Sequence, residues 1–98
     1  MTSAQAGGAG SASVSSTTIT IADFAYGTPV TVVPGGTVTV INNDDVPHTV
    51  TSDGPGVFDV NIGPGDTVTF AAPTESGSYD FHCSYHPNMH GSLVVQGQ

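Results

Sequence analysis

Apolar and polar residues alternate along most of this chain with a period of two. Segment 18–21 reads Thr-Ile-Thr-Ile, segment 37–40 reads Thr-Val-Thr-Val, and segment 67–70 reads Thr-Val-Thr-Phe. Side chains of a β-strand point to opposite faces in turn, so this pattern is typical of strands that bury one face. Val, Ile, Thr and aromatic residues, which strands prefer, dominate these segments. No stretch supports a helix of three turns.

Turn-forming sequences separate the alternating segments. Residues 34–36, 42–45 and 63–66 are rich in Pro, Gly, Asn and Asp, which favour turns. The expected strands cover residues 17–24, 29–33, 37–42, 48–52, 57–61, 66–71, 77–83 and 91–95. Short strands at this spacing predict an all-β fold, an antiparallel Greek-key β-sandwich of roughly seven to eight strands.

The chain has 98 residues, which is the length of one domain. Residues 1–16 are rich in Ala, Gly and Ser, which predicts a flexible N-terminal tail before a single domain over residues 17–98. No apolar run approaches the roughly 20 residues of a membrane span, and no signal peptide is visible. Such a tail suits a mature exported protein whose signal or lipid-attachment segment has been removed. We therefore expect a periplasmic or other cell-envelope location, with membrane contact only through such a segment.

The charge balance of the chain is one-sided. It contains no Lys or Arg and eight acidic residues, for a formal net charge of −8. Nucleic-acid binding requires cationic side chains that contact phosphates, so this role is excluded. Anionic membrane surfaces are disfavoured for the same reason. We expect a charged protein partner to present a basic surface at the contact, and the chain itself to be a monomer.

The single Cys lies in the most informative segment, which reads Cys83-Ser84-Tyr85-His86-Pro87-Asn88-Met89. One Cys cannot form an intrachain disulfide. The spacing Cys-x-x-His-x-x-Met places a thiolate, an imidazole and a thioether in one loop between the last two expected strands. Thiolate and thioether select soft or borderline metals, and imidazole suits copper. Two nitrogens and a thiolate with a weak axial thioether make a blue-copper site, so the loop lacks only a second imidazole.

His48 is the best candidate for the second imidazole. It lies in segment 42–50, where a turn passes into an expected strand, and in a sandwich this turn can meet the 83–90 loop at one end. Pro47 and Pro87, each next to a candidate ligand, restrict backbone motion. Rigidity matters because copper(II) and copper(I) prefer different geometries. We therefore predict that His48, Cys83, His86 and Met89 bind one copper ion.

These motifs resemble those of the plastocyanin/azurin-like cupredoxins. The resemblance covers about residues 17–96, and the short Cys-x-x-His-x-x-Met loop with Pro after the His is most similar to that of the amicyanins. The flanking segments that carry the resemblance are Phe24 with Tyr26, Asn42-Asn43, Val46-Pro47-His48-Thr49-Val50 and Gly77-Ser78-Tyr79-Asp80-Phe81-His82-Cys83. It implies a type 1 copper site with His48, Cys83 and His86 as equatorial ligands and Met89 as the axial ligand. It further implies that His86 lies near the surface and is the exit for the electron.

Two positions depart from the pattern of these cupredoxins. Thr49 stands where many of them have an Asn that ties the two ligand loops together, and we expect its hydroxyl to form the bond across the site. Asn88 stands where amicyanin has a large aromatic residue beside the exposed His. We therefore expect a smaller apolar docking patch, left mainly to Val46, Pro47 and Pro87.

Other readings of single residues remain open at this stage. Cys83 could be a buried structural thiol, Met89 could plug the end of the sandwich, and His48 could be a solvated turn residue. We expect His82 and His90 not to be ligands, because His82 points away from Cys83 by strand alternation and His90 follows the axial Met. The acidic residues Asp44, Asp45 and Asp53 are interpreted as turn and loop residues.

The pattern favours a carrier of single electrons between redox partner proteins, and not an enzyme, because a fully ligated mononuclear site leaves no position for substrate. A copper-binding or copper-delivery protein of the cell envelope would use the same ligands. A fragment of a multicopper oxidase is disfavoured, since no paired His-x-His motifs are present. A structural sandwich or a zinc protein is the remaining alternative, and Met89 argues against zinc.

Overall fold

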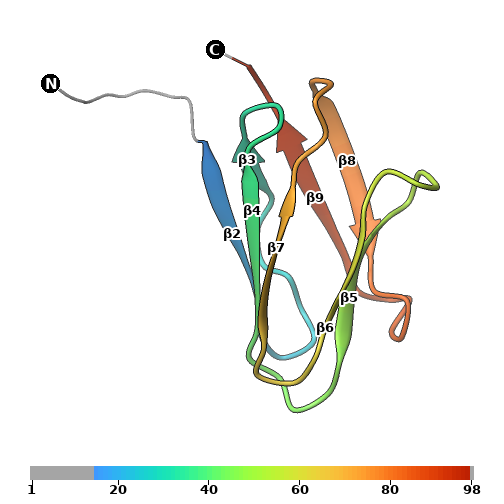
Figure 1. Ribbon diagram of the computed structural model, residues 1–98. Helices are drawn as coiled ribbons and strands as arrows, with labels where there is room; N and C mark the ends of the chain where they lie inside the picture. The colour runs from blue at the N-terminus through green and yellow to red at the C-terminus, as the bar shows by residue number, and fades with distance from the viewer. Residues whose placement is uncertain (1–14, 98) are drawn as a thin grey trace, which may run out of the picture.

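The computed structural model of the protein describes residues 15–97, which form two packed β-sheets (Figure 1). The strands are β2 (Ser16–Ile21), β3 (Val30–Val32), β4 (Thr37–Asn42), β5 (His48–Ser52), β6 (Asp59–Ile62), β7 (Thr67–Ala71), β8 (Gly77–His82) and β9 (His90–Val95). One sheet has the order β2-β4-β7 and the other the order β3-β9-β8-β5-β6. Within residues 15–97, no helix is long and apolar enough to cross a membrane. The all-β sandwich is therefore confirmed.

Most neighbouring strands are antiparallel, but each sheet contains one parallel pair. β2 runs parallel to β4, and β3 runs parallel to β9. β2 and β3 follow one another along the chain yet belong to different sheets, so the connection between them crosses the sandwich. The expected antiparallel sandwich therefore contains two parallel strand pairs, β2–β4 and β3–β9.

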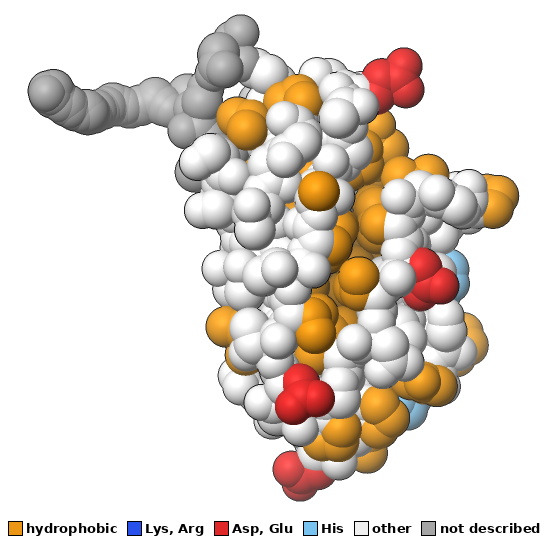
Figure 2. All heavy atoms as spheres, in the orientation of Figure 1, with side chains coloured by type: hydrophobic (Ala, Val, Ile, Leu, Met, Phe, Trp, Pro, Cys, Tyr) orange, Lys and Arg blue, Asp and Glu red, His pale blue; other side chains and the backbone are white. Residues whose placement is uncertain are grey.

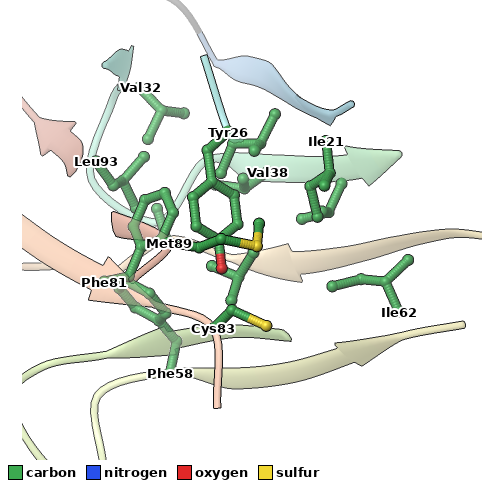
Figure 3. Packing of buried hydrophobic residues seen from close by; sticks show 14 of the residues in the cluster. Ile21, Tyr26, Val32, Val38, Phe58, Ile62, Phe81, Cys83, Met89 and Leu93 are labelled. Atoms are coloured by element: carbon green, nitrogen blue, oxygen red, sulfur yellow. The ribbon is translucent and has the colours of Figure 1, made fainter. Parts of the chain in front are cut away.

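The period-two pattern places one face of each sheet in a shared core. In β4, Val38 and Val40 are fully buried while Thr37 is exposed, and β2 buries Ile19 and Ile21 in the same way. Figure 3 shows Val38 and Ile21 in the same cluster as Tyr26, Phe58 and Phe81. Burial of such side chains contributes about 1.5–3 kcal/mol each relative to exposure.

The first strand is shorter than the pattern predicted. The expected strand over residues 17–24 ends at Ile21, because Ala22 and Ala25 form a tight turn with two reciprocal backbone hydrogen bonds of 3.1 and 3.0 Å. The predicted tail lies mostly outside the described residues, and Ser16, which was assigned to it, is the first residue of β2.

Candidate metal centre

Two loops bring the predicted ligands to one end of the sandwich. His48 is the first residue of β5, Cys83 directly follows β8, and Met89 directly precedes β9. His86 lies in the loop between Cys83 and Met89. The β4–β5 and β8–β9 connections both lie toward the lower end of the molecule in Figure 1. Residues far apart in the sequence therefore meet there.

The loop from Cys83 to Met89 is held by its own backbone. The His86 N–H donates to the Cys83 carbonyl at 3.3 Å, and the Met89 N–H donates to the His86 carbonyl at 2.8 Å. The Cys83 N–H donates to the Met89 carbonyl at 3.2 Å, which closes the loop. Three candidate donors thus belong to one compact backbone unit that these hydrogen bonds hold together.

A buried amide holds the loop that precedes His48. Asn42 is fully buried, and its Nδ2 donates to the carbonyls of Val46 at 2.8 Å and of Ile62 and Gly63 at 3.1 Å. Its Oδ1 accepts the N–H of Asp44 at 2.9 Å. A buried amide with both ends satisfied favours a single arrangement of the surrounding backbone. Asn42 therefore fixes the path of the chain into β5.

Thr49 joins the two ligand loops. Its Oγ1 accepts the N–H of Ser84 at 2.8 Å, directly beside Cys83, and its carbonyl accepts the hydroxyl of Tyr26. The expectation that the Thr49 hydroxyl takes over the bond across the site is confirmed. Burial raises the pKa of Tyr26, with the neighbouring Cys83 as a second cause, so its hydroxyl remains a donor.

Asp44 orients the His48 ring. The Nε2 of His48 lies 2.8 Å from Oδ2 of Asp44, and Nδ1 on the other side of the ring lies 3.7 Å from Sγ of Cys83. Imidazoles that bind metals usually donate their other N–H to a carboxylate, which fixes ring orientation and tautomer. Asp44 is therefore more than the turn residue that its sequence context predicts. Its position four residues before a predicted His ligand was a signal that could have indicated this role.

The Cys83 sulfur is surrounded by donors that favour the thiolate. Burial raises the pKa of the Cys83 thiol, but the backbone N–H of Thr49, which lies 3.4 Å from Sγ, acts in the opposite direction. His48 and the backbone N–H groups of Tyr85 and His86 add to this effect, so the net pKa is lowered. The thiolate is the form that binds metals. The open reading of Cys83 as an inert buried thiol is therefore disfavoured.

The spacing of the donors fits a common ion. Nitrogen and sulfur ligands at the bond lengths typical of such sites, with a ligand–metal–ligand angle near 110–120°, lie about 3.6–3.8 Å apart. The observed distance between His48 Nδ1 and Cys83 Sγ is 3.7 Å. The His48 and His86 rings lie 5.2 Å apart between centroids, and Met89 is buried with Cys83 in the same cluster (Figure 3). Within residues 15–97, no three His, Cys, Asp or Glu side chains are grouped so that they could hold a metal ion, so the fit is shown only for the His48–Cys83 pair.

The surface beside His86 is more apolar than expected. His86 is partly exposed, and the half-exposed ring of Phe24 packs against it. Tyr85 is also half exposed, and its hydroxyl accepts an N–H of Asn61 at 2.6 Å. Figure 2 shows apolar side chains gathered at this lower end of the molecule. The expected patch of Val46, Pro47 and Pro87 thus omitted two aromatic residues, Phe24 and Tyr85. Phe24 was omitted because it was expected in a strand, whereas it lies in a turn.

His82 and His90 lie outside this group, on the outer face of the β8–β9 pair. Nδ1 of His82 lies 2.7 Å from Oδ1 of Asp53, so its ring is turned toward a neighbouring strand as the alternation predicted. His90 lines an open hollow of about 430 Å³ together with Asp53 and Asp80. That neither is a ligand stays a prediction.

The fold and these donors together define a class of protein. Residues 1–95 match the model of the cupredoxin-like domain family. The chain belongs to the cupredoxin-like family.

Two of the similar curated proteins are amicyanins. The chain is 37% identical over 86 residues to amicyanin of Paracoccus denitrificans, an alignment that covers 80% of this chain and 63% of that protein. It is 38% identical over 89 residues to amicyanin-alpha of Methylorubrum extorquens strain AM1, covering 83% of this chain and 72% of that protein. The chain thus spans slightly less than two thirds of the Paracoccus protein.

Solved structures of amicyanin variants share the fold. A reduced variant superposes with a TM-score of 0.70 at 32% identity, covering 84% of this chain and 83% of that chain. A copper(I) form of another variant gives a TM-score of 0.70 at 31% identity with the same coverage. Among relatives of known structure, the similarity therefore extends over most of the described residues.

Proposed function

We propose that this chain is a type 1 copper protein that carries single electrons between redox partners and is not an enzyme. The observation that carries the proposal is the 3.7 Å approach of His48 Nδ1 to Cys83 Sγ; the His86 ring lies 5.2 Å from the His48 ring, and Met89 is buried in the same core as Cys83. When bound, copper would supply the reversible one-electron couple. The donor set of two imidazoles, a thiolate and a thioether suits copper better than zinc.

Each residue of the site contributes a distinct property. His48 presents Nδ1 because Asp44 holds Nε2, and the donors around the Cys83 sulfur lower the pKa of its thiol, which favours the thiolate form. Burial of Met89 excludes water from its side of the site. His86 is the one of the four donors that reaches the surface, so a docked partner would approach the site most closely there.

We further propose that the partner contacts the apolar surface formed by Phe24, Tyr85, Pro47 and Pro87 around His86, and presents basic groups at its edge. The net charge of −8 supports the basic edge.

A methylamine utilization protein of Methylophilus methylotrophus is 33% identical over 66 residues, covering 63% of this chain and 38% of that protein. We also propose a periplasmic or other cell-envelope location, which the similarity to the amicyanins supports.

Copper(II) titration of the metal-free chain tests the proposal. We expect an intense blue absorption band that saturates at one copper per chain, with narrow copper hyperfine splitting in electron paramagnetic resonance. Cys83→Ser provides the control, since it removes the thiolate and should leave at most a pale signal. A pale signal from the unmodified chain would overturn the proposal and favour the alternatives of a zinc protein or a structural sandwich.

A further inference from the structure

The turn that follows β2 has an unusual backbone. Ala22 and Ala25 exchange backbone hydrogen bonds of 3.1 and 3.0 Å around the two residues between them, Asp23 and Phe24. Both central residues have positive φ, 52° and 60°. Two-residue connections of this kind normally contain Asn-Gly or Asp-Gly, because a side chain is disfavoured at positive φ. A bulky aromatic residue in this conformation needs a specific cause.

The carboxylate of Asp44 holds this turn in place. Oδ1 accepts the N–H of Asp23 at 2.9 Å, and Oδ2 accepts the N–H of Phe24 at 3.0 Å. The same Oδ2 lies 2.8 Å from Nε2 of His48. One carboxylate therefore positions both the strained turn and a candidate metal ligand, although the turn and Asp44 are some 20 residues apart in sequence.

The consequence of the strained turn is the place of the Phe24 ring. Its centroid lies 4.9 Å from that of His86 at an interplanar angle of 79°, and 5.2 Å from that of His48 at 85°. Both are edge-to-face contacts, which are favourable for aromatic rings. Yet 49% of Phe24 is exposed, so the residue contributes little to the core. Strain of this kind at a surface aromatic points to a role at the site and not to stability alone.

We infer that Phe24 is a positioning residue for His86, and that the Asp44-held turn exists to keep the Phe24 ring against the His86 imidazole. His86 is partly exposed and sits in a loop, and its neighbouring rings are those of Phe24 and of His48, the latter 5.2 Å away between centroids. The ring of Phe24 limits the orientations open to the imidazole before a metal binds. The inference rests on the proposed function only in treating His86 as a metal donor.

The first test uses the metal-free chain and compares Phe24→Gly with the unmodified protein. Glycine adopts positive φ without steric cost, so the turn is retained while the ring is lost. Side-chain coupling constants measured by nuclear magnetic resonance report the rotamer populations of His86. We expect the preference for the main rotamer to fall by about twofold to tenfold, the range of one aromatic contact. His82, the other partly exposed imidazole, serves as the internal reference and should not change.

Asp23→Gly is the matched control. It relieves the same left-handed strain in the same turn but keeps the Phe24 ring. We expect it to leave the His86 rotamers unchanged, and we expect Phe24→Tyr to retain them because the ring remains. An unchanged His86 in Phe24→Gly, or an equal effect in Asp23→Gly, would overturn the inference. If Phe24→Gly does not fold, Phe24→Asn replaces it, since Asn also tolerates this backbone region.

A second test measures the rate at which the copper-loaded chain loses copper to a chelator. We expect Phe24→Gly to lose copper about twofold to tenfold faster, with Asp23→Gly and Phe24→Tyr unchanged. An equal rate in all variants would contradict the positioning role. A chain that binds no copper would refute the proposed function, while the rotamer measurement would still decide on Phe24.

Discussion

The molecule contains two Asp–His pairs with nearly the same geometry and different surroundings. Asp44 and His48 are joined at 2.8 Å with side chains that are 13% and 0% exposed. Asp53 and His82 are joined at 2.7 Å with side chains that are 51% and 31% exposed. The distance between the carboxylate oxygen and the ring nitrogen therefore does not distinguish the two pairs. What differs is the second ring nitrogen, since Nδ1 of His48 faces Cys83 whereas His82 lies on the outer face of β8.

A carboxylate beside an imidazole therefore gains a role at a site only where the pair is buried and the opposite ring nitrogen has a partner. An exposed pair exchanges freely with water and contributes little to stability. A buried pair fixes the tautomer and orientation of the ring, which matters only if the opposite nitrogen has a partner. The following predictions test this difference, beginning with the largest expected effect.

His48→Gln and His82→Gln should separate the two pairs completely. Loss of His48 removes a nitrogen donor, so the intense blue band should disappear, while His82→Gln should retain the full band at one copper per chain. Absorption during copper titration measures both. A blue site that survives His48→Gln, or is lost in His82→Gln, would reverse the assignment of ligand and non-ligand.

The carboxylates should show the same order with smaller effects. Asp44→Asn should weaken copper affinity by about 10- to 100-fold, because partners of metal-bound imidazoles contribute on this scale. Asp53→Asn removes the same charge and should change affinity by less than about twofold. Competition with a chelator of known affinity gives both values. Equal losses in the two variants would mean that net charge, and not ring orientation, governs binding.

The pH dependence of stability provides a third test, on the metal-free chain. The N–H of Phe24 is the main cause that holds the pKa of Asp44 below its ordinary value of 3.8; burial acts against it, and His48 and the Asp23 N–H assist. A carboxyl whose folded pKa is lowered contributes stability that is present well above 3.8 and is lost as pH falls through the lower folded pKa. The stability difference between the unmodified chain and Asp44→Asn should therefore shrink below about pH 4. Chemical denaturation at several pH values measures it, and a difference that grows toward acid would show that the sign is wrong.

The smallest effect concerns the exposed pair itself. Asp53→Asn should lower the free energy of unfolding by less than about 1 kcal/mol at neutral pH, and the effect should diminish with added salt. Urea denaturation at low and high ionic strength measures this change. A larger, salt-independent loss would indicate that Asp53 and His82 support the β5–β8 contact more than their exposure suggests.

The alternation along the chain determined the strands by itself. β4 and β5 coincide with the predicted segments 37–42 and 48–52; in β4 alternate residues are buried as period two requires, whereas β5 is buried on both faces. The spacing Cys-x-x-His-x-x-Met likewise placed three donors in one loop, since residues so close in sequence cannot separate far in space. Two loops were expected to meet at one end of the sandwich. This expectation predicted that His48 would lie near Cys83 and Met89.

Only the tertiary structure decided what surrounds those donors. The contacts of Asp44 with the N–H groups of Asp23 and Phe24 join residues 21 and 20 positions apart, and no local pattern encodes such pairs. The turn at Asp23 and Phe24 was not predicted, because the intrinsic preference of Phe24 opposes positive φ, and the Asp44 carboxylate holds the turn in this conformation. Local sequence specifies what depends on near neighbours, whereas the site's supporting contacts depend on how the two sheets bring distant loops together.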